Sequence, residues 1–159
     1  EVCETKQEAF KANTIPGTIE AEDFDTGCAG DAFYDTNETN EGGQYRLETG
    51  VDIEKCSEGG YNVGWAHRGE WMAYTVRVDK SGAYQISFHV ASANNGSGMH
   101  LECDGVNITG GIAVPNTAGY QKWEVIKKTV KLDAGEHLLK VVMDTDNLNF
   151  DKMVFEEVH

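Results

Sequence analysis

Residues 58–76 of this chain have the sequence EGGYNVGWAHRGEWMAYTV, which changes character halfway along. The first half is rich in glycine and asparagine and ends on Trp65, which is typical of a loop that presents an aromatic side chain. From Trp71 onward, large residues alternate with small or polar ones through Tyr74 and Val76, which predicts a β-strand. We therefore expect a rigid strand with a tryptophan held at the surface beside it, a flat apolar face suited to a sugar ring.

The pattern of short strands continues to the end of the chain. Turn sequences rich in Gly, Asn, Asp and Ser separate the candidate strands at intervals of roughly ten residues. These strands are expected at residues 71–78, 84–91, 99–104, 123–132, 137–143 and 150–156. Many short strands with such punctuation predict an all-β fold, a sandwich of two sheets.

The rest of the chain divides into a polar start and a long excursion. We interpret residues 1–14 as an N-terminal lead-in or linker, and residues 15–159 as a single folded module. Residues 25–50 are rich in Gly, Asp, Asn and Thr, so they predict a long loop without regular structure. Loops of this length are usually functional or mobile.

The composition of the chain is acidic and leaves room for a core. Its 159 residues suffice for one domain, and no apolar run approaches the roughly 18 residues of a membrane-spanning helix. The 27 acidic and 13 basic residues give a formal net charge of −14. This charge argues against nucleic-acid or anionic-membrane partners, because both require phosphate neutralisation. A neutral ligand, bound cations and plain solubility are all compatible with it.

The four cysteines are an even number without a CxxC pair or a Cys/His ligand spacing, so a zinc site is not expected. Secretion with one or two disulfides fits this count. The connectivity stays open, although Cys28 and Cys56 both lie in glycine-rich loop sequence and form the favoured pair. Because the chain begins on Glu1 without a visible signal peptide, we expect a mature or excised part of a larger protein.

Four motifs, in order, resemble those of the family 6 carbohydrate-binding modules. They are IEAEDF at 19–24, GYNVGW with GEW at 60–71, GYQKW at 119–123 and NFDKMVF at 149–155. The resemblance extends over residues 15–156, nearly the whole chain. It implies a jelly-roll β-sandwich of two antiparallel sheets, a structural calcium ion, and a non-catalytic role that tethers a glycoside hydrolase to its polysaccharide.

The resemblance also implies a sugar site in the loops at one end of the sandwich. Matched motif to motif, two aromatic side chains that clamp a sugar ring fall on Trp65 and Tyr120, and a hydrogen-bonding asparagine falls on Asn149. The alternatives are that Trp65 packs in the core and that Asn149 merely caps a turn. Trp123 is expected in the core.

Trp71 occupies the position at which some family members have a second site on the concave sheet. The acidic partner of that site has no clear match here, since Glu102 or Cys103 falls near its position. We therefore expect a structural or unused role for Trp71.

A metal site is implied by three acidic residues. Glu20 and Glu22 are two residues apart on a predicted strand, so their carboxylates point to one face. With Asp151 from the last strand they make three hard oxygen donors, which suit calcium, and the family's structural calcium uses acids at these motif positions. The alternative is a solvated acidic strand edge.

The long excursion and the loop after Trp65 offer further candidate contacts. Tyr34 and Asp35, with Tyr45 and Arg46, could extend the clamp or wall off one end of the groove, which would favour chain ends. A solvated loop braced by a cysteine is the alternative. Arg68, close to the clamp, keeps open a uronate-binding relative with calcium in the sugar site.

The expected ligand is a β-linked polysaccharide, with β-1,3-glucan or a related β-glucan first and xylan, agarose or a uronate-containing glycan as alternatives. The rival class is a small glycoside hydrolase with paired carboxylates. However, the acids lie in no recognisable catalytic motif, and no HExxH or serine-elbow motif is present. We therefore expect a non-catalytic, secreted, monomeric module linked to a catalytic domain.

Overall fold

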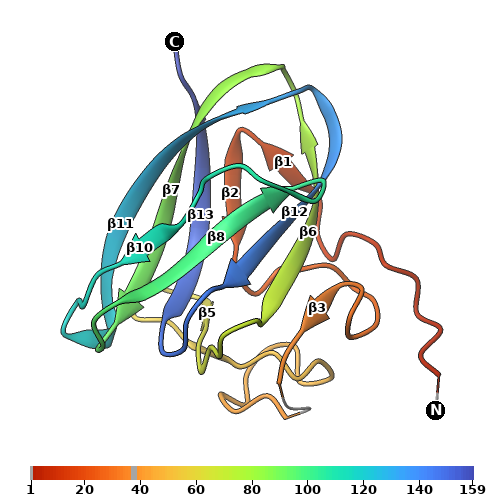
Figure 1. The fold of residues 1–159 in the computed structure, drawn as a ribbon. Coiled ribbons are helices and arrows are strands. Elements are labelled where there is room, and N and C mark those ends of the chain that lie inside the picture. The colour runs from red at the N-terminus through yellow and green to blue at the C-terminus, as the bar shows by residue number, and fades with distance from the viewer. Residues whose placement is uncertain (1, 37–38) are drawn as a thin grey trace.

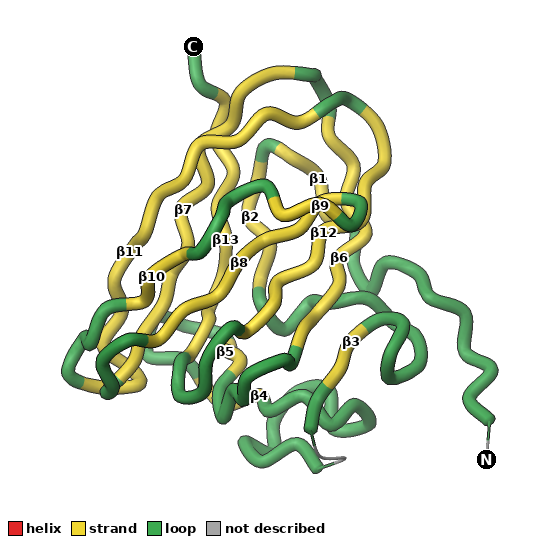
Figure 2. Tube along the Cα trace, viewed as in Figure 1, coloured by secondary structure: helices red, strands yellow, loops and turns green. Residues whose placement is uncertain are grey.

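The computed structural model describes residues 2–36 and 39–159, and over these residues it contains thirteen strands and no helix. Accordingly, it has no helix that could cross a membrane. The strands form two layers, and most of the long loops gather at the lower end of the view in Figures 1 and 2. The predicted all-β sandwich of two sheets is confirmed.

One sheet carries the strand with which the opening motif ends. Its path is β1-β6-β12-β8-β10, with β3 paired to β6 and β9 paired to β8. Its pairs are antiparallel except β1 with β6. The bounds are β1 (Asn13–Ile15), β3 (Phe33–Tyr34), β6 (Trp71–Val78), β8 (Ser97–Cys103), β9 (Val106–Asn107), β10 (Ile112–Val114) and β12 (Gly135–Met143).

The other sheet is antiparallel throughout and has the path β11-β7-β13-β5-β4, with β2 paired to β13. Its bounds are β2 (Gly17–Glu20), β4 (Ile53–Lys55), β5 (Tyr61–Val63), β7 (Gly82–Ser92), β11 (Gly119–Leu132) and β13 (Asn149–Glu157). The six predicted strands correspond to β6, β7, β8, β11, β12 and β13. The Gly/Asn-rich text before Trp65, expected as loop, contains the short strand β5.

The core lies between the two sheets and follows from the period of two along each strand. In β7, the alternate residues Tyr84, Ile86, Phe88 and Val90 are buried, and the residues between them are not. In the facing sheet, β12 buries Leu139, Val141 and Met143 in the same way.

The excursion over residues 25–50 contains only the two-residue strand β3 among its described residues. Arg46 holds its base: the guanidinium lies 3.9 Å from the ring centres of both Phe10 and Phe24 and donates to the Asp25 carbonyl at 3.0 Å. Because Arg46 is 3% exposed, it braces the loop and does not extend a clamp, so that expectation was wrong.

The disulfide joins Cys3 to Cys28, so the favoured pairing of Cys28 with Cys56 was wrong. Cys56 and Cys103 are free thiols. The bond ties the N-terminal segment to the excursion, and the segment enters the sheet at Asn13, where β1 begins. The prediction failed because it compared only the loop character of the sequence around each cysteine. A disulfide requires two Cα atoms that lie close together in space, and those of Cys3 and Cys28 are 5.9 Å apart.

Candidate functional site

A cavity of about 310 Å³ opens at the loop end of the sandwich. The three predicted sugar-site residues, Trp65, Tyr120 and Asn149, all line it, although the first and the last are 84 positions apart in the sequence. They come from the loop after β5, the start of β11 and the start of β13. The complete lining is Glu54, Trp65, Tyr120, Asn147, Leu148 and Asn149.

Trp65 is presented at the surface. Its side chain is 44% exposed, and its backbone has a left-handed φ of 47°, which few non-glycine residues adopt. The neighbouring Ala66 is buried, and its carbonyl accepts from the Asn147 N–H at 3.0 Å. The loop is thereby pinned to the opposite wall of the cavity, so the indole is held in place rather than packed in the core.

Tyr120 lies where the pairing of β11 with β7 shifts, between Gly119 and Glu124. A register shift of this kind re-aims the side chains of a strand. The phenol is half-buried, and its hydroxyl oxygen accepts a hydrogen bond from the Asn94 amide. Tyr120 therefore forms an aromatic wall held at both its backbone and its hydroxyl.

Asn149 forms the polar floor of the cleft and is 3% exposed. Its Nδ2 donates to the Tyr120 carbonyl at 2.7 Å and to Glu54 Oε2 at 3.1 Å. Both amide hydrogens are thus used by the protein, which fixes the side chain and leaves Oδ1 to accept from a ligand.

Glu54 is the site residue that sequence reasoning missed. Its Oε2 accepts from both Asn149 and Asn62, the latter at 3.3 Å. Asn62 in turn accepts from Gln121 at 2.9 Å. No motif marks Glu54; its place in β4, paired with Asn62 of β5, is what brings it to the cleft.

Trp123 lies beside this network. Its indole N–H donates to Ser57 Oγ at 3.0 Å, and the residue is half-buried on β11. The expectation that Trp123 belongs to the core was wrong, because its strand faces solvent on that side and its N–H has a partner there.

Three other candidate residues lie outside the cavity lining. Tyr34, in β3, pairs with Trp71 on the other sheet, and Asp35 follows it. Arg68 is exposed and its backbone N–H donates to Asp146 Oδ1 at 2.7 Å. Tyr34 and Asp35 instead line a neighbouring pocket together with Val63 and Ala66, close in sequence to Trp65. Their part in chain-end binding stays a prediction.

Trp71 is half-buried in β6, on the sheet opposite the cleft strands. The Lys140 ammonium lies 3.9 Å from its ring centre, a cation–π contact. This contact occupies one face of the Trp71 indole, which fits the expected structural role of this residue.

The three predicted calcium ligands also come together. One carboxylate oxygen each of Glu20, Glu22 and Asp151 lies within 4.8 Å of the others. Glu22 Oε1 and both Asp151 carboxylate oxygens are buried without a hydrogen-bond partner. Burial, then the neighbouring acidic groups, raises the pKa of Glu22 to about 8 and that of Asp151 to about 8. Unpaired, buried, hard oxygen donors fit calcium.

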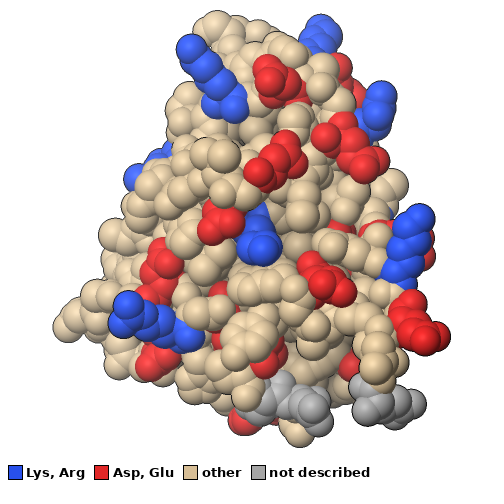
Figure 3. Space-filling view, turned by 45° about the vertical axis from the view of Figure 1, so that its right-hand side comes forward, with Lys and Arg blue, Asp and Glu red and all other residues tan. Residues whose placement is uncertain are grey.

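The distribution of charge bears on chemistry at the cleft. Figure 3 shows acidic side chains scattered over one face of the molecule, with basic ones between them and no basic patch. Among the described residues, Glu54 is the single carboxylate in the cavity lining. A glycoside hydrolase of the usual kind uses two carboxylates across the scissile bond.

Comparisons with known proteins agree with this geometry. A family model described as carbohydrate binding module (family 6) matches residues 41–157. The clotting factor G alpha subunit of Tachypleus tridentatus is 35% identical over 105 residues, a match that covers 64% of this chain and 16% of that protein. The chain thus spans less than a fifth of the length of this relative.

Two solved structures share the fold over most of the chain. The C-terminal CBM6 of LamC, a marine laminarinase from Zobellia galactanivorans, is 30% identical with a TM-score of 0.69, covering 88% of this chain and 98% of that one. CBM6cm-2 of Cellvibrio mixtus lichenase 5A, solved with cellotriose, is 27% identical with a TM-score of 0.67, covering 96% and 100%.

Proposed function

This chain belongs to family 6 of the carbohydrate-binding modules, which bind carbohydrate and are not catalytic, and on this premise we propose that its cleft binds a β-linked glucan. β-1,3-Glucan is the first choice. The observation that carries the proposal is the convergence of Trp65, Tyr120 and Asn149 on one cavity.

The chemistry of a sugar ring suits this arrangement. Its C–H faces pack on the aromatic rings of Trp65 and Tyr120, while its hydroxyls need polar partners at the edge. Asn149 Oδ1 is held by the protein as an acceptor for such a hydroxyl. Because open aromatic sites gain modest energy and lose part of it to ordering, we expect a Kd between about 1 µM and 1 mM.

The choice of β-1,3-glucan is supported by the laminarinase relative, whose enzyme is named for a β-1,3-glucan. The relative solved with cellotriose makes β-1,4-glucan a second candidate among the β-glucans. Xylan, agarose and uronate-containing glycans remain the alternatives. The exposed Arg68, three residues after Trp65 in the sequence, is the feature that would serve a uronate.

A structural calcium ion is part of the proposal. Glu20, Glu22 and Asp151 would hold it, and the ion would neutralise buried carboxylates and tie the end of β2 to β13, which are already paired. Its role would be to stabilise the fold, since none of the three ligands lines the sugar cavity.

We also propose that the chain targets an attached glycoside hydrolase to its substrate outside the cell. The laminarinase and lichenase relatives are modules of such enzymes, which supports this role. The Cys3–Cys28 disulfide supports an oxidising compartment.

Isothermal titration calorimetry against laminarin, xylan and agarose oligosaccharides tests the ligand and the site together. We expect heat with laminarin, and a loss of at least tenfold in affinity for Trp65→Ala and for Tyr120→Ala. Trp71→Ala, whose ring lies on the other sheet, is the matched control and should bind like the wild type. Full affinity in both cleft variants would show that the proposed site is wrong. Tighter binding of xylan or agarose than of laminarin would show that the proposed ligand is wrong.

A reducing-end assay on the same glycans addresses the rival enzyme class. Binding without release of reducing ends is the expected result, and release by the purified chain would overturn it. Loss of binding after calcium removal, with the fold retained, would favour the uronate-binding class, in which calcium contacts the sugar.

A further inference from the structure

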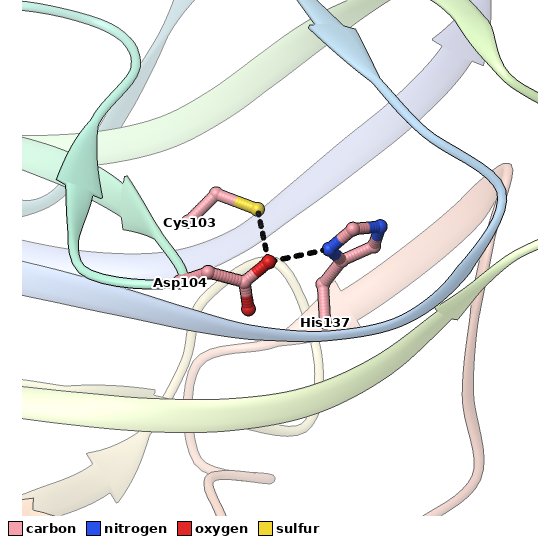
Figure 4. A group of neighbouring side chains, drawn as sticks. All are labelled: Cys103, Asp104 and His137. Atoms are coloured by element: carbon pink, nitrogen blue, oxygen red, sulfur yellow. Dashed lines mark hydrogen bonds and ion pairs between the residues drawn. The ribbon is translucent and has the colours of Figure 1, made fainter.

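A cluster of three side chains with different donor atoms lies on the sheet that contains β6. Cys103 ends β8, Asp104 begins the turn to β9, and His137 lies in β12 (Figure 4). One potential ligand atom of each, a sulfur, an oxygen and a nitrogen, lies within 4.8 Å of the others. None of the three lines the sugar cavity or belongs to the acidic group at Glu20.

The backbone holds the first two residues in place. Asp104 and Gly105 both have left-handed φ angles, 50° and 85°, so they form a tight turn between β8 and β9. Asp104 N–H donates to the Leu138 carbonyl at 2.8 Å, and Leu138 N–H donates to Asp104 Oδ1 at 2.9 Å. The carboxylate is thus oriented with Oδ2 directed at the thiol and the imidazole, at 3.9 Å and 2.6 Å.

The imidazole of His137 is oriented from its far side. Its Nε2 lies 2.7 Å from the Asp133 carbonyl oxygen, which can only accept, so Nε2 carries a hydrogen. Nδ1 then faces Cys103 and Asp104. A histidine that ligates a metal commonly donates its other ring N–H to a backbone carbonyl or a carboxylate, which fixes the ring and its tautomer. This second interaction points to a ligand at Nδ1 independently of the cluster itself.

We propose that Cys103, Asp104 and His137 bind a borderline-soft divalent metal ion, zinc in the first place, through Sγ, Oδ2 and Nδ1. Sulfur, nitrogen and oxygen together are donors for zinc, whereas the all-oxygen group at Glu20 suits calcium. On binding, the metal replaces one proton on Sγ and one on Nδ1, and both protons pass to solvent without any change of oxidation state.

The geometry needs only a small adjustment. In a tetrahedral site with metal–ligand distances of about 2.0–2.3 Å, the ligand atoms lie about 3.3–3.5 Å apart. The observed 2.6 Å between Oδ2 and Nδ1 would open and the 3.9 Å between Oδ2 and Sγ would close, each by less than about 1 Å. A cavity of about 320 Å³, lined in part by Asp104 and His137, adjoins the cluster and leaves room for the ion to enter and for a fourth ligand.

The position of this site separates it from carbohydrate binding. Ser97, the first residue of β8, hydrogen-bonds Asn147 of the sugar cavity, whereas Cys103 is the last residue of the same strand. Seven extended residues span about 20 Å. The metal would therefore fasten the β8–β9 turn to the start of β12 at the end of the sheet away from the cleft.

Cobalt and zinc titrations of the whole chain, with calcium in excess to fill the acidic site, test the proposal. Cobalt should give one equivalent of a near-ultraviolet thiolate-to-metal absorption band, which zinc then abolishes by displacement. Calorimetry should show that Cys103→Ser and His137→Gln each weaken zinc binding at least tenfold. Cys56→Ser, which removes the other free thiol, should leave zinc binding and laminarin binding unchanged.

Three results would contradict the metal site. Absence of a thiolate band, unchanged zinc affinity in Cys103→Ser, or loss of the band in Cys56→Ser would each overturn the proposal and leave a plain His137–Asp104 ion pair. Urea unfolding without metal establishes that each variant is folded. If His137→Gln did not fold, Cys103→Ser and Asp104→Asn would decide the result.

Discussion

Gly64 lies where the polar floor of the cleft comes closest to the backbone. A Cβ at this position would be 2.8 Å from Glu54 Oε2 and 3.1 Å from Asn149 Oδ1. Its backbone is not left-handed, so glycine is needed here for space rather than for conformation. The residue before the clamp tryptophan is therefore part of the site even though it has no side chain.

We expect Gly64→Ala to weaken laminarin binding at least tenfold, about 1.4 kcal/mol, because the methyl group displaces the Asn149 amide. Calorimetry measures the affinity. Gly82→Ala is the matched control, since a Cβ there meets nothing within 4 Å and the cleft should be unaffected. Equal affinity of Gly64→Ala and the wild type would show that the asparagine is not a ligand contact.

Glu54 should act by positioning Asn149. Glu54→Gln keeps an oxygen acceptor for the two asparagine amides, so its laminarin affinity should stay within about threefold of the wild type. Glu54→Ala leaves the amides of Asn62 and Asn149 without this acceptor, so its laminarin affinity should fall about tenfold. This loss agrees with the cost of about 1–3 kcal/mol for an unpaired buried polar group. An equally large loss in both variants would mean that the charge of Glu54 contacts the ligand directly.

Among the elements, the N-terminal segment is held by two kinds of attachment. β1 pairs with β6, and the disulfide joins Cys3 to Cys28 across 25 residues. A backbone bridge between Glu8 and Thr26 lies between these two attachments. The polar segment that the sequence suggested as a lead-in is thus fastened along its length to the excursion.

The double variant Cys3→Ala/Cys28→Ala removes the disulfide and should lower the free energy of unfolding by about 3 kcal/mol. The reason is that the unfolded chain, no longer closed into a loop, gains conformational entropy. Urea denaturation under non-reducing conditions provides the measurement. An unchanged midpoint would contradict this expectation and show that the segment unfolds apart from the sandwich.

β8 also carries a titrating histidine. His100 Nδ1 lies 2.9 Å from Asp144, and its Nε2 lies 2.8 Å from Glu102. Burial alone would lower the pKa of His100, but the hydrogen bonds to these two carboxylates outweigh it and raise the pKa above 6.5. The ion pairs therefore contribute stability fully below about pH 6.5, and this contribution is lost as the pH rises through the folded-state pKa.

His100→Gln should cost about 0.5–1 kcal/mol of unfolding free energy at pH 6 and almost nothing at pH 9. Urea denaturation at the two pH values measures the difference. His159→Gln, at the exposed C-terminus, is the control variant. A cost for His100→Gln that is the same at both pH values would assign the residue a packing role instead.

For the whole molecule, the acidic group at the end of β2 joins one strand of the sandwich to the last strand of the chain. It places the buried carboxylates of Glu22 and Asp151 beside Glu20, and three of the buried oxygen atoms of Glu22 and Asp151 have no hydrogen-bond partner. An ion that binds the folded chain alone stabilises it by mass action, by about 2.7 kcal/mol at a concentration 100-fold above its Kd.

Calcium in excess should therefore raise the thermal midpoint by several degrees relative to EDTA, as followed by circular dichroism. Glu20→Gln removes one charged ligand at the half-buried rim and should reduce this gain, whereas Glu156→Gln on the exposed face of β13 should not. A midpoint that is identical in calcium and EDTA would refute the calcium proposal.

The local pattern of the sequence determined the strands. Alternation with a period of two is set by neighbouring residues, so the six predicted strands lie within a few residues of β6, β7, β8, β11, β12 and β13. The motifs also placed Trp65, Tyr120 and Asn149, because they resemble a family whose loops carry these roles. Short strands without alternation, such as β3 and β9, escaped prediction because two residues carry no period.

The tertiary structure decided which distant side chains meet. Strand pairing brings Glu54 within hydrogen-bonding distance of Asn149, and it brings His137 beside Cys103. The path of the N-terminal segment brings Cys3, rather than Cys56, to Cys28. The tertiary structure also places Tyr34 in the other sheet, where it pairs with Trp71. Such contacts depend on register, turns and the order of strands in each sheet, and no periodic or local signal in the sequence encodes them.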